Sequence, residues 1–140
     1  CNVREVHKLS PGIINFIDDN ISFLDVRSKP CLVHKDYHCS HIITDRNNVT
    51  GIIDVEWALA GHNETDFMKM ELWAFKDMKE TRTSFFKGYK KWGIISKEYN
   101  ERKKLYELWH LINMVSISYE LKNKQYLDYN VKEIRRFLKR

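Results

Sequence analysis

The stretch LVHKDYHCSHIITDRNNVTGIID, residues 32–54, decides the fold of this chain. Residues 41–45 and 49–54 are two runs rich in β-branched and apolar side chains, and they flank Asn47 and Asn48. Asparagine tolerates the positive φ angles that a tight turn requires. The pattern therefore predicts a β-hairpin with its turn at the two asparagines.

The register of this hairpin would bring polar side chains together. If pairing is symmetric about Asn47 and Asn48, His41 lies directly opposite Asp54. Directly opposed residues of an antiparallel pair have Cβ atoms about 4.5–5.5 Å apart on one face, so both side chains could reach one cation. A bulge would spoil this register. Asp36, in the loop before the hairpin, adds a carboxylate near the same point.

This set of side chains suits one kind of chemistry. Phosphoryl transfer from a nucleotide needs a carboxylate that orients or deprotonates the acceptor hydroxyl, and ligands for a metal ion that neutralises the phosphate oxygens. Asp36 would be the base. His41 and Asp54 would be the metal ligands, and through the metal they would help to bind the nucleotide.

Two linked motifs resemble a known family. Residues 32–41 resemble the catalytic loop of aminoglycoside phosphotransferases and related small-molecule kinases with a protein-kinase-like fold, whose pattern is His-x-Asp-x-x-x-x-Asn. Residues 51–57, Gly-Ile-Ile-Asp-Val-Glu-Trp, resemble the metal-binding segment of that family, an apolar strand that ends in Asp. The hairpin between the motifs has the length that the family requires.

The resemblance implies a role for each matching residue. Asp36 would be the catalytic base, His34 a residue that shapes the loop, and Asp54 the principal magnesium ligand. Asp66 would be a helix-start residue that bonds back to the core. His41 stands where most of the family has Asn, and because magnesium prefers oxygen ligands, Mn2+ is an alternative to Mg2+. The 2″-aminoglycoside phosphotransferases are closest in pattern, since they too have a second His there.

The rest of the chain predicts an α+β, mainly helical fold. The expected elements are a buried strand at Cys31–Val33 and about five helices: one starting at Ser10-Pro11-Gly12, then about 65–78, 81–92, 96–122 and 125–139. We expect residues 1–140 to form a single domain, the C-terminal lobe of a kinase-like phosphotransferase. Nothing in residues 1–33 resembles the N-terminal nucleotide-binding lobe of the family, so this lobe is expected to be a missing partner and the chain to be an inactive fragment by itself.

Composition and charge limit the partners. No apolar run approaches the roughly 20 residues of a membrane span, so we expect a soluble chain. The three cysteines are an odd number in a chain large enough to fold without disulfides, which favours the cytoplasm. The formal net charge is +5, but the basic residues are spread along amphipathic helices, and we do not expect nucleic-acid binding.

The expected substrates are a nucleotide, ATP or GTP, and a small-molecule hydroxyl acceptor. Five acids between residues 54 and 71 would suit a polycationic acceptor, so an aminoglycoside is the first candidate. Choline, homoserine, methylthioribose and protein-bound sugars are alternatives within the superfamily. Glu56 and Trp57 either contact this acceptor or fill the turn after Asp54.

Three alternatives remain open at this level. His34, His38, Cys39 and His41 are zinc-ligand types, although their close spacing lacks the separated pairs of structural zinc sites. His41 could donate to Asp54 without a metal. The chain could also be a degenerate kinase-like binding or regulatory module without catalysis, in which Asp36 merely caps a turn.

Overall fold

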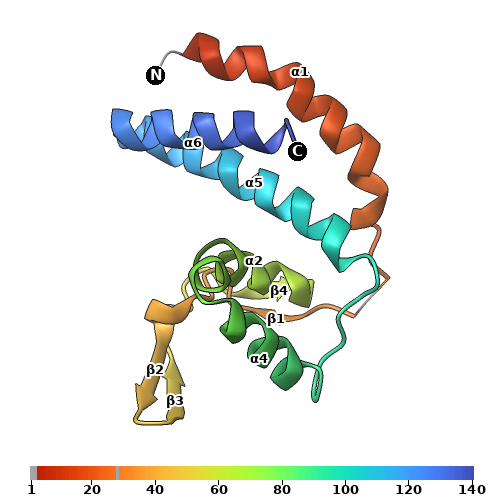
Figure 1. Ribbon diagram of the computed structural model, residues 1–140, viewed down its shortest axis with the longest axis vertical. Helices are drawn as coiled ribbons and strands as arrows, with labels where there is room; N and C mark the ends of the chain where they lie inside the picture. Colours follow the sequence, from red (N-terminus) through yellow and green to blue (C-terminus); the bar gives the residue numbers. More distant parts are fainter. Residues whose placement is uncertain (1–2, 28) are drawn as a thin grey trace. The chain divides into compact units, whose positions relative to one another are not determined.

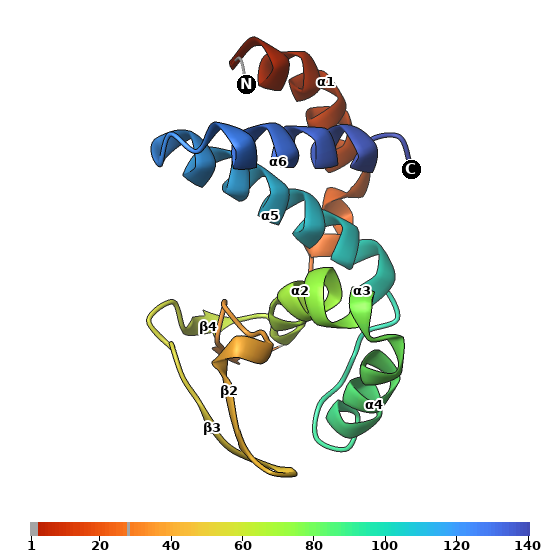
Figure 2. The same ribbon diagram turned by 60° about the vertical axis from the view of Figure 1, so that its left-hand side comes forward.

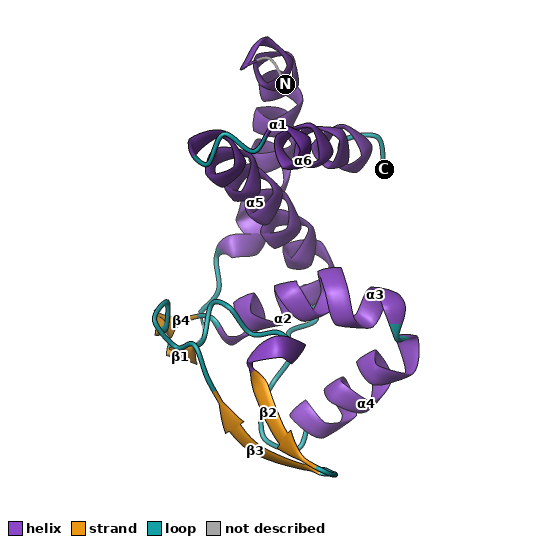
Figure 3. Ribbon diagram, turned by 90° about the vertical axis from the view of Figure 1, so that its left-hand side faces the viewer, coloured by secondary structure: helices purple, strands orange, loops and turns teal. Residues whose placement is uncertain are grey.

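Helices and two small antiparallel sheets make up the computed structural model, which describes residues 3–27 and 29–140 (Figures 1 and 3). The longer helices are α1 (Val3–Asn20), α4 (Lys79–Tyr89), α5 (Tyr99–Glu120) and α6 (Lys124–Phe137). A fifth helical stretch joins the 3-10 turn η3 (Asn63–Asp66), α2 (Phe67–Lys69), the π-helical turn η4 (Met70–Ala74) and α3 (Phe75–Asp77). The strands are β1 (Cys31–Val33), β2 (Ile42–Asp45), β3 (Asn48–Ile52) and β4 (Leu59–Gly61). This confirms the predicted fold class.

The described chain forms two compact units. One contains the chain up to Asp25 together with Asn100–Arg140, and the other is Val26–Tyr99. No described helix combines the length and the apolar character that crossing a membrane requires.

The first unit packs α1 against α5 and α6 (Figure 1). Leu9, Ile13 and Phe16 of α1 cover a core that contains Leu108 and Ile134, each 1% exposed. Apolar residues spaced three and four apart form one face of a helix. This face starts at Leu9, before the Ser-Pro-Gly stretch that was expected to start the helix.

The predicted start of the first helix is therefore wrong. The described part of α1 already begins at Val3, and Pro11 lies inside it. The side chain of Ser10 donates a hydrogen bond to the Val6 carbonyl at 3.4 Å instead of capping a helix start. Gly12 permits a close approach of α6, because a Cβ there would lie 3.3 Å from Leu138.

The second unit has an aromatic core next to its smaller sheet. Phe67, Phe75, Phe86 and Tyr99 are buried together between the helical stretch and α4. Beside them, β1 pairs with β4, which the sequence analysis did not predict. The expectation of a buried strand holds for Val33, which is 1% exposed, whereas its neighbour Leu32 is 82% exposed.

The hairpin of β2 and β3 extends from this unit (Figure 2), and its register differs from the prediction. The turn is centred on Arg46 and Asn47, one residue earlier than expected, and Arg46 takes the positive φ of 53°. A bulge between Ile43 and Thr44 shifts the pairing again. As a result His41 lies opposite Ile53 rather than opposite Asp54. The Ile53 N–H donates a hydrogen bond to the His41 carbonyl at 3.0 Å.

Candidate active site

His34 ties the loop after β1 to the end of the hairpin. Its Nε2 lies 2.8 Å from the carbonyl oxygen of Ile53. A carbonyl only accepts, so Nε2 carries the proton, and Nδ1 is free to accept from the Asp36 N–H at 3.3 Å. Both ring nitrogens of His34 are thus engaged within the protein, and the ring is almost fully buried. These are the contacts of a residue that shapes the loop.

Asp66 fixes the same loop from the other side. Its two carboxylate oxygens accept hydrogen bonds from the backbone N–H groups of His34 and Lys35, each at 2.8 Å. Lys35 has a left-handed backbone with φ of 68°, which costs free energy in an L-residue and needs such an anchor. Asp66 makes no capping bond to α2 and serves the loop instead.

The loop presents Asp36 with its side chain 20% exposed. Lys69 of α2 forms an ion pair with Asp36 Oδ1, a contact that the sequence analysis missed. Burial lowers the pKa of Lys69. The Lys69 ammonium also lies 5.4 Å from the ring centroid of Trp73, one helical turn further along. The spacing of Lys69 and Trp73 within an expected helix was visible in the sequence, but nothing there indicated that this face points at the loop.

His41 and Asp54 meet even though they are not opposed in the hairpin. His41 Nε2 lies 3.1 Å from Asp54 Oδ2. Asp54 follows the last residues of β3 and takes a left-handed backbone, φ 64°, which leaves the extended course of the strand. This turn carries the carboxylate to His41 and compensates for the shifted register. The predicted proximity is therefore found, by a route that the sequence analysis did not foresee.

The hydrogen bonds of His41 make this pair a fitting cation site. Its Nδ1 lies 2.9 Å from the carbonyl oxygen of Asp36, and 3.9 Å from Asp36 Oδ2. If the Nδ1 proton is donated to the carbonyl, the neutral ring directs the Nε2 lone pair at the carboxylate of Asp54. Two acceptors 3.1 Å apart repel unless a proton or a cation lies between them. Imidazole nitrogen and carboxylate oxygen are both ligands of divalent metals.

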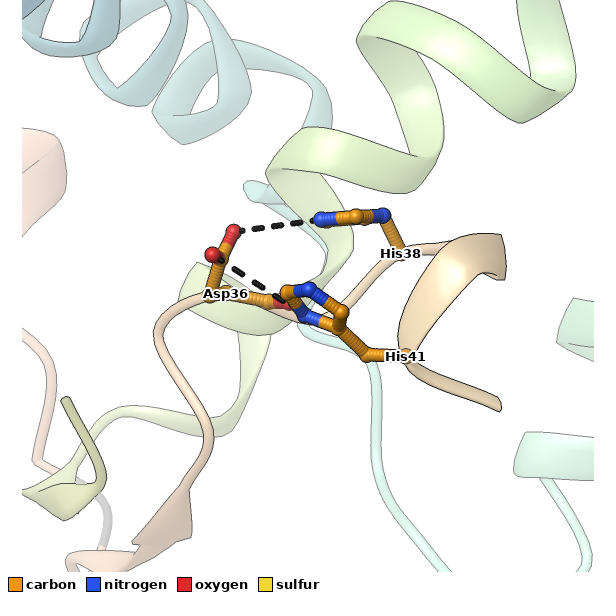
Figure 4. Close-up of side chains that lie close together, drawn as sticks. All are labelled: Asp36, His38 and His41. Carbon is orange, nitrogen blue, oxygen red and sulfur yellow. Dashed lines mark hydrogen bonds and ion pairs between the residues drawn. The ribbon is translucent and has the colours of Figure 1, made fainter. Parts of the chain in front are cut away.

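A second histidine, His38, lies beside the carboxylate of Asp36 (Figure 4). Its Nε2 is 3.6 Å from Asp36 Oδ1, and its ring centroid is 3.9 Å from that of His41. Burial lowers the pKa of His38, and neighbouring His41 and His34 lower it further. Ligand atoms of Asp36, His38 and His41 all lie within 4.8 Å of one another.

The predicted zinc set is not the set that the structure assembles. Both ring nitrogens of His34 are engaged in hydrogen bonds with Ile53 and Asp36. Cys39 is exposed and does not belong to the group of Asp36, His38 and His41. Asp36, which the zinc alternative did not include, lies between His38 and His41.

Glu56 and Trp57 lie in the exposed turn between Asp54 and β4. The Trp57 side chain is 65% exposed, whereas a side chain that only fills the turn would be expected to be buried. The turn itself is closed by a bond from the Ala58 N–H to the Val55 carbonyl at 3.0 Å.

The other acids of residues 54–71 hold the fold together. Glu64 is 1% exposed and accepts from the Ser96 N–H at 2.7 Å. Glu71 accepts a bifurcated hydrogen bond from Arg82 Nε, 3.1 Å to each carboxylate oxygen, a bond from Arg82 Nη2 at 2.8 Å, and one from the Tyr99 hydroxyl at 3.0 Å. With Asp66 bound to the loop, three of the five acids serve structural bonds, and the acidic stretch is not one open surface for a polycation.

The fold resembles that of solved aminoglycoside phosphotransferase structures. A solved structure of a thermostable mutant of aminoglycoside phosphotransferase APH(4)-Ia, in ternary complex with AMP-PNP and hygromycin B, superposes with a TM-score of 0.69 at 16% identity. The match covers 94% of this chain and 44% of that one. A second ternary complex, with another substitution, gives a TM-score of 0.67 at 17% identity over 95% of this chain and 44% of that one. At this identity the likeness concerns the fold.

The sequence defines the family within this fold. A family model described as fructosamine kinase matches residues 5–140, nearly the whole chain. The chain therefore belongs to the fructosamine kinase family, and the predicted membership of a small-molecule kinase family with a protein-kinase-like fold is confirmed.

A curated relative supports this membership. The chloroplastic protein-ribulosamine 3-kinase of Arabidopsis thaliana is 34% identical over 93 residues, which are 65% of this chain and 26% of that protein. The chain thus spans about a quarter of the length of this relative and less than half of the solved structures.

Proposed function

We propose that this chain provides the catalytic loop and metal ligands of an ATP-dependent kinase that phosphorylates a sugar hydroxyl of a ketosamine, a sugar joined to an amine. The observation that carries the proposal is the chain of contacts from Asp36 through His41 to Asp54. His41 Nδ1 lies 2.9 Å from the backbone carbonyl oxygen of Asp36 and 3.9 Å from its carboxylate, and Nε2 lies 3.1 Å from the carboxylate of Asp54. The base and the metal ligands that phosphoryl transfer requires would thus lie side by side.

Asp36 is the residue that meets the acceptor hydroxyl. Its half-buried carboxylate would orient this hydroxyl and accept its proton as the phosphoryl group is transferred. The bond from the Asp36 N–H to His34 Nδ1 limits the movement of its backbone. The ammonium of Lys69 forms an ion pair with Oδ1 of this carboxylate.

His41 and Asp54 would hold the divalent metal, Mg2+ or Mn2+, which neutralises charge on the phosphate oxygens when it is bound. His41 offers Nε2 while Nδ1 remains bonded to the Asp36 carbonyl, so that the metal ligand is oriented by the catalytic loop itself. The side chain of Asp54 is 44% exposed, so a metal bound there would be accessible from solvent.

The nucleotide would need further protein for tight binding. The chain corresponds to 26% of the ribulosamine kinase and 44% of the solved phosphotransferases. We propose that a nucleotide-binding lobe outside this sequence covers the phosphates, and that the chain alone turns over substrate poorly.

A ketosamine replaces the aminoglycoside as the proposed acceptor, because the curated relative is named a protein-ribulosamine 3-kinase. A ketosamine has sugar hydroxyls and a basic amine. The exposed Trp57 offers an apolar face for the sugar, and the exposed carboxylate of Glu56 would attract the amine.

The test uses the longest natural polypeptide that carries this sequence, ATP, magnesium and a peptide with one ribulosamine-modified lysine. Phosphate addition is followed by mass spectrometry. Asp36→Asn should lower kcat by about 10²–10⁴-fold, the range for loss of a general base. Asp45→Asn, the same change in the exposed hairpin, is the matched control and should retain the wild-type rate.

A second arm measures metal binding apart from turnover. Mn2+ bound to the protein, followed by electron paramagnetic resonance, should be lost in Asp54→Ala and retained in Asp45→Asn. Turnover that survives Asp36→Asn would refute the role of the base. A wild-type protein that binds neither Mn2+ nor nucleotide would instead identify a degenerate binding module.

A further inference from the structure

We propose that Asp36, His38 and His41 form a second metal site, which selects zinc over magnesium and overlaps the proposed active site, so that bound zinc arrests phosphoryl transfer. The binding of zinc stands on the geometry of the three side chains alone. Its inhibitory effect rests on the proposed function.

The three side chains are already gathered around one point (Figure 4). Their ligand atoms lie within 4.8 Å of one another, with His38 Nε2 at 3.6 Å from Asp36 Oδ1 and His41 Nδ1 at 3.9 Å from Asp36 Oδ2. A tetrahedral zinc ion with ligands at about 2.0–2.1 Å holds ligand atoms roughly 3.3 Å apart. The two histidines face different oxygens of Asp36, and the three ligand atoms spread over as much as 4.8 Å, so the side chains have to draw together by up to about 1.5 Å when zinc binds.

Solvent reaches all three groups. The side chains of Asp36, His38 and His41 are 20%, 16% and 15% exposed. The cluster is thus accessible to an ion, and yet sheltered enough to hold its ligands in place.

The second nitrogen of His41 completes a recurring pattern of zinc sites. A zinc-bound histidine usually donates its other ring N–H to a carboxylate. When Nδ1 binds zinc, the proton of the neutral ring resides on Nε2, and Nε2 lies 3.1 Å from Asp54 Oδ2. His41 can therefore serve either site through a change of tautomer: Nε2 toward a metal shared with Asp54, or Nδ1 toward zinc, which then replaces the contact of Nδ1 with the Asp36 carbonyl.

The donor set determines which ion enters. Two imidazole nitrogens and one carboxylate, with an open fourth position, match the three-ligand zinc sites of enzymes. Magnesium requires near-octahedral oxygen ligands and binds such a set weakly. His38 has no part in the proposed phosphoryl transfer; its Nδ1 accepts a hydrogen bond from the Ser40 N–H at 3.3 Å, and its Nε2 faces Asp36. The indole of Trp73 packs edge-on to the His38 ring at 5.1 Å between centroids and limits its movement.

Lys69 opposes the ion. Its ammonium pairs with the same Asp36 oxygen that faces His38, so zinc has to displace this cation or bind beside it. The ion pair would keep the affinity for zinc moderate. Zinc bound to Asp36 and His41 would remove both the base and a ligand of the catalytic metal, which arrests the reaction.

The binding test uses this chain and Zn2+ alone, by calorimetric titration, with Co2+ absorption as a measure of tetrahedral coordination. The wild type should bind one ion, and His38→Ala should weaken binding at least tenfold. His38→Gln repeats the test with a side chain of closer size, and circular dichroism verifies that both variants fold. His7→Ala, an exposed histidine of α1, and Cys39→Ser should bind as the wild type does.

Lys69→Met provides a test with the opposite sign. Removal of the competing ammonium should tighten zinc binding severalfold, whereas a lysine that merely supports the fold would give weaker binding or none. Unchanged zinc affinity in both His38 variants, or its loss in Cys39→Ser, would overturn the site.

The inhibitory effect is measured in the longer polypeptide as the zinc concentration that halves each variant's own zinc-free rate. His38→Ala should raise this concentration at least tenfold relative to wild type. Zinc that binds the chain but leaves an active wild-type kinase uninhibited would refute the inhibitory role. A longer polypeptide that turns over no ketosamine would refute the proposed function, while the titrations still decide the zinc site.

Discussion

Replacement of Asp66 by Asn should destabilise the Val26–Tyr99 unit, because it removes the one carboxylate that accepts two backbone hydrogen bonds from the loop after β1. Asp66 accepts from the backbone N–H groups of His34 and Lys35, each at 2.8 Å. Asparagine retains one acceptor oxygen and places an amide NH2 against the other N–H. One charge-assisted bond is lost, and the second becomes a weaker neutral bond.

The magnitude follows from these two bonds. A hydrogen bond to a charged group contributes about 1.5–3 kcal/mol, and a neutral one about 0.5–1.5 kcal/mol. Loss of one and weakening of the other gives a destabilisation of roughly 2–4 kcal/mol. Urea unfolding gives this difference, and amide hydrogen exchange at His34 and Lys35 locates it. Asp45→Asn, on the exposed hairpin, should change the stability by less than about 0.5 kcal/mol.

The exchange measurement separates a local from a general effect. In Asp66→Asn the protection of the His34 and Lys35 amides should fall more than that of amides in α4. A destabilisation below about 1 kcal/mol, or equal losses of protection throughout the unit, would refute the claim that Asp66 fixes the loop that begins at His34.

Two further predictions concern packing and pH. A Cβ on Gly61 would lie 2.9 Å from Val33 Cγ2, so Gly61→Ala should destabilise the protein by about 1–3 kcal/mol in urea unfolding. A Cβ on Gly88 in α4 would meet no atom within 4 Å, so Gly88→Ala should stabilise the protein by about 0.5–1 kcal/mol. Stability changes of the same sign for both variants would contradict this packing. Burial and the Glu71 carboxylate raise the pKa of Tyr99 above its ordinary value of about 10. The folded state therefore holds this proton while the unfolded chain releases it, and stability should fall as pH rises above about 10. Tyr99→Phe should show a shallower decline over that range, and an identical slope would exclude Tyr99 as a source.

The sequence was sufficient for the fold class because the helices have strong periodic patterns. The expected helix at residues 125–139 is found as α6, Lys124–Phe137, and the expected helix at 96–122 as α5, Tyr99–Glu120. The predicted start of α1 is too late because Pro11 is typical of the first turn of a helix, whereas here it lies inside α1 and the apolar face already begins at Leu9. β4 was missed because three residues are too short for a period to be visible.

The candidate site was predictable in its membership and not in its geometry. The sequence indicated Asp36, His41 and Asp54, but the bulge in β2–β3 and the left-handed backbone of Asp54 depend on three-dimensional context. The shifted register moves Asp54 away from the position opposite His41, and the left-handed backbone of Asp54 brings its carboxylate back to His41. The contact of Lys69 with Asp36 joins residues 33 positions apart, and no local pattern could reveal it.

Substitution by glycine at the residues with positive φ should raise the thermal stability of the protein, but at one of these residues it would also affect the proposed function. Among the described residues Lys35, Arg46, Asp54 and Lys122 share this backbone, which disfavours most L-residues by roughly 1–2 kcal/mol and which glycine adopts freely. Lys35 belongs to the loop that Asp66 anchors, and the other three lie outside that anchor. Glycine at the hairpin tip or directly after α5 would offer thermostable variants for crystallisation. Glycine at Asp54 would relieve the same strain and remove a proposed metal ligand, so resistance to heat and the proposed chemistry compete at that one residue.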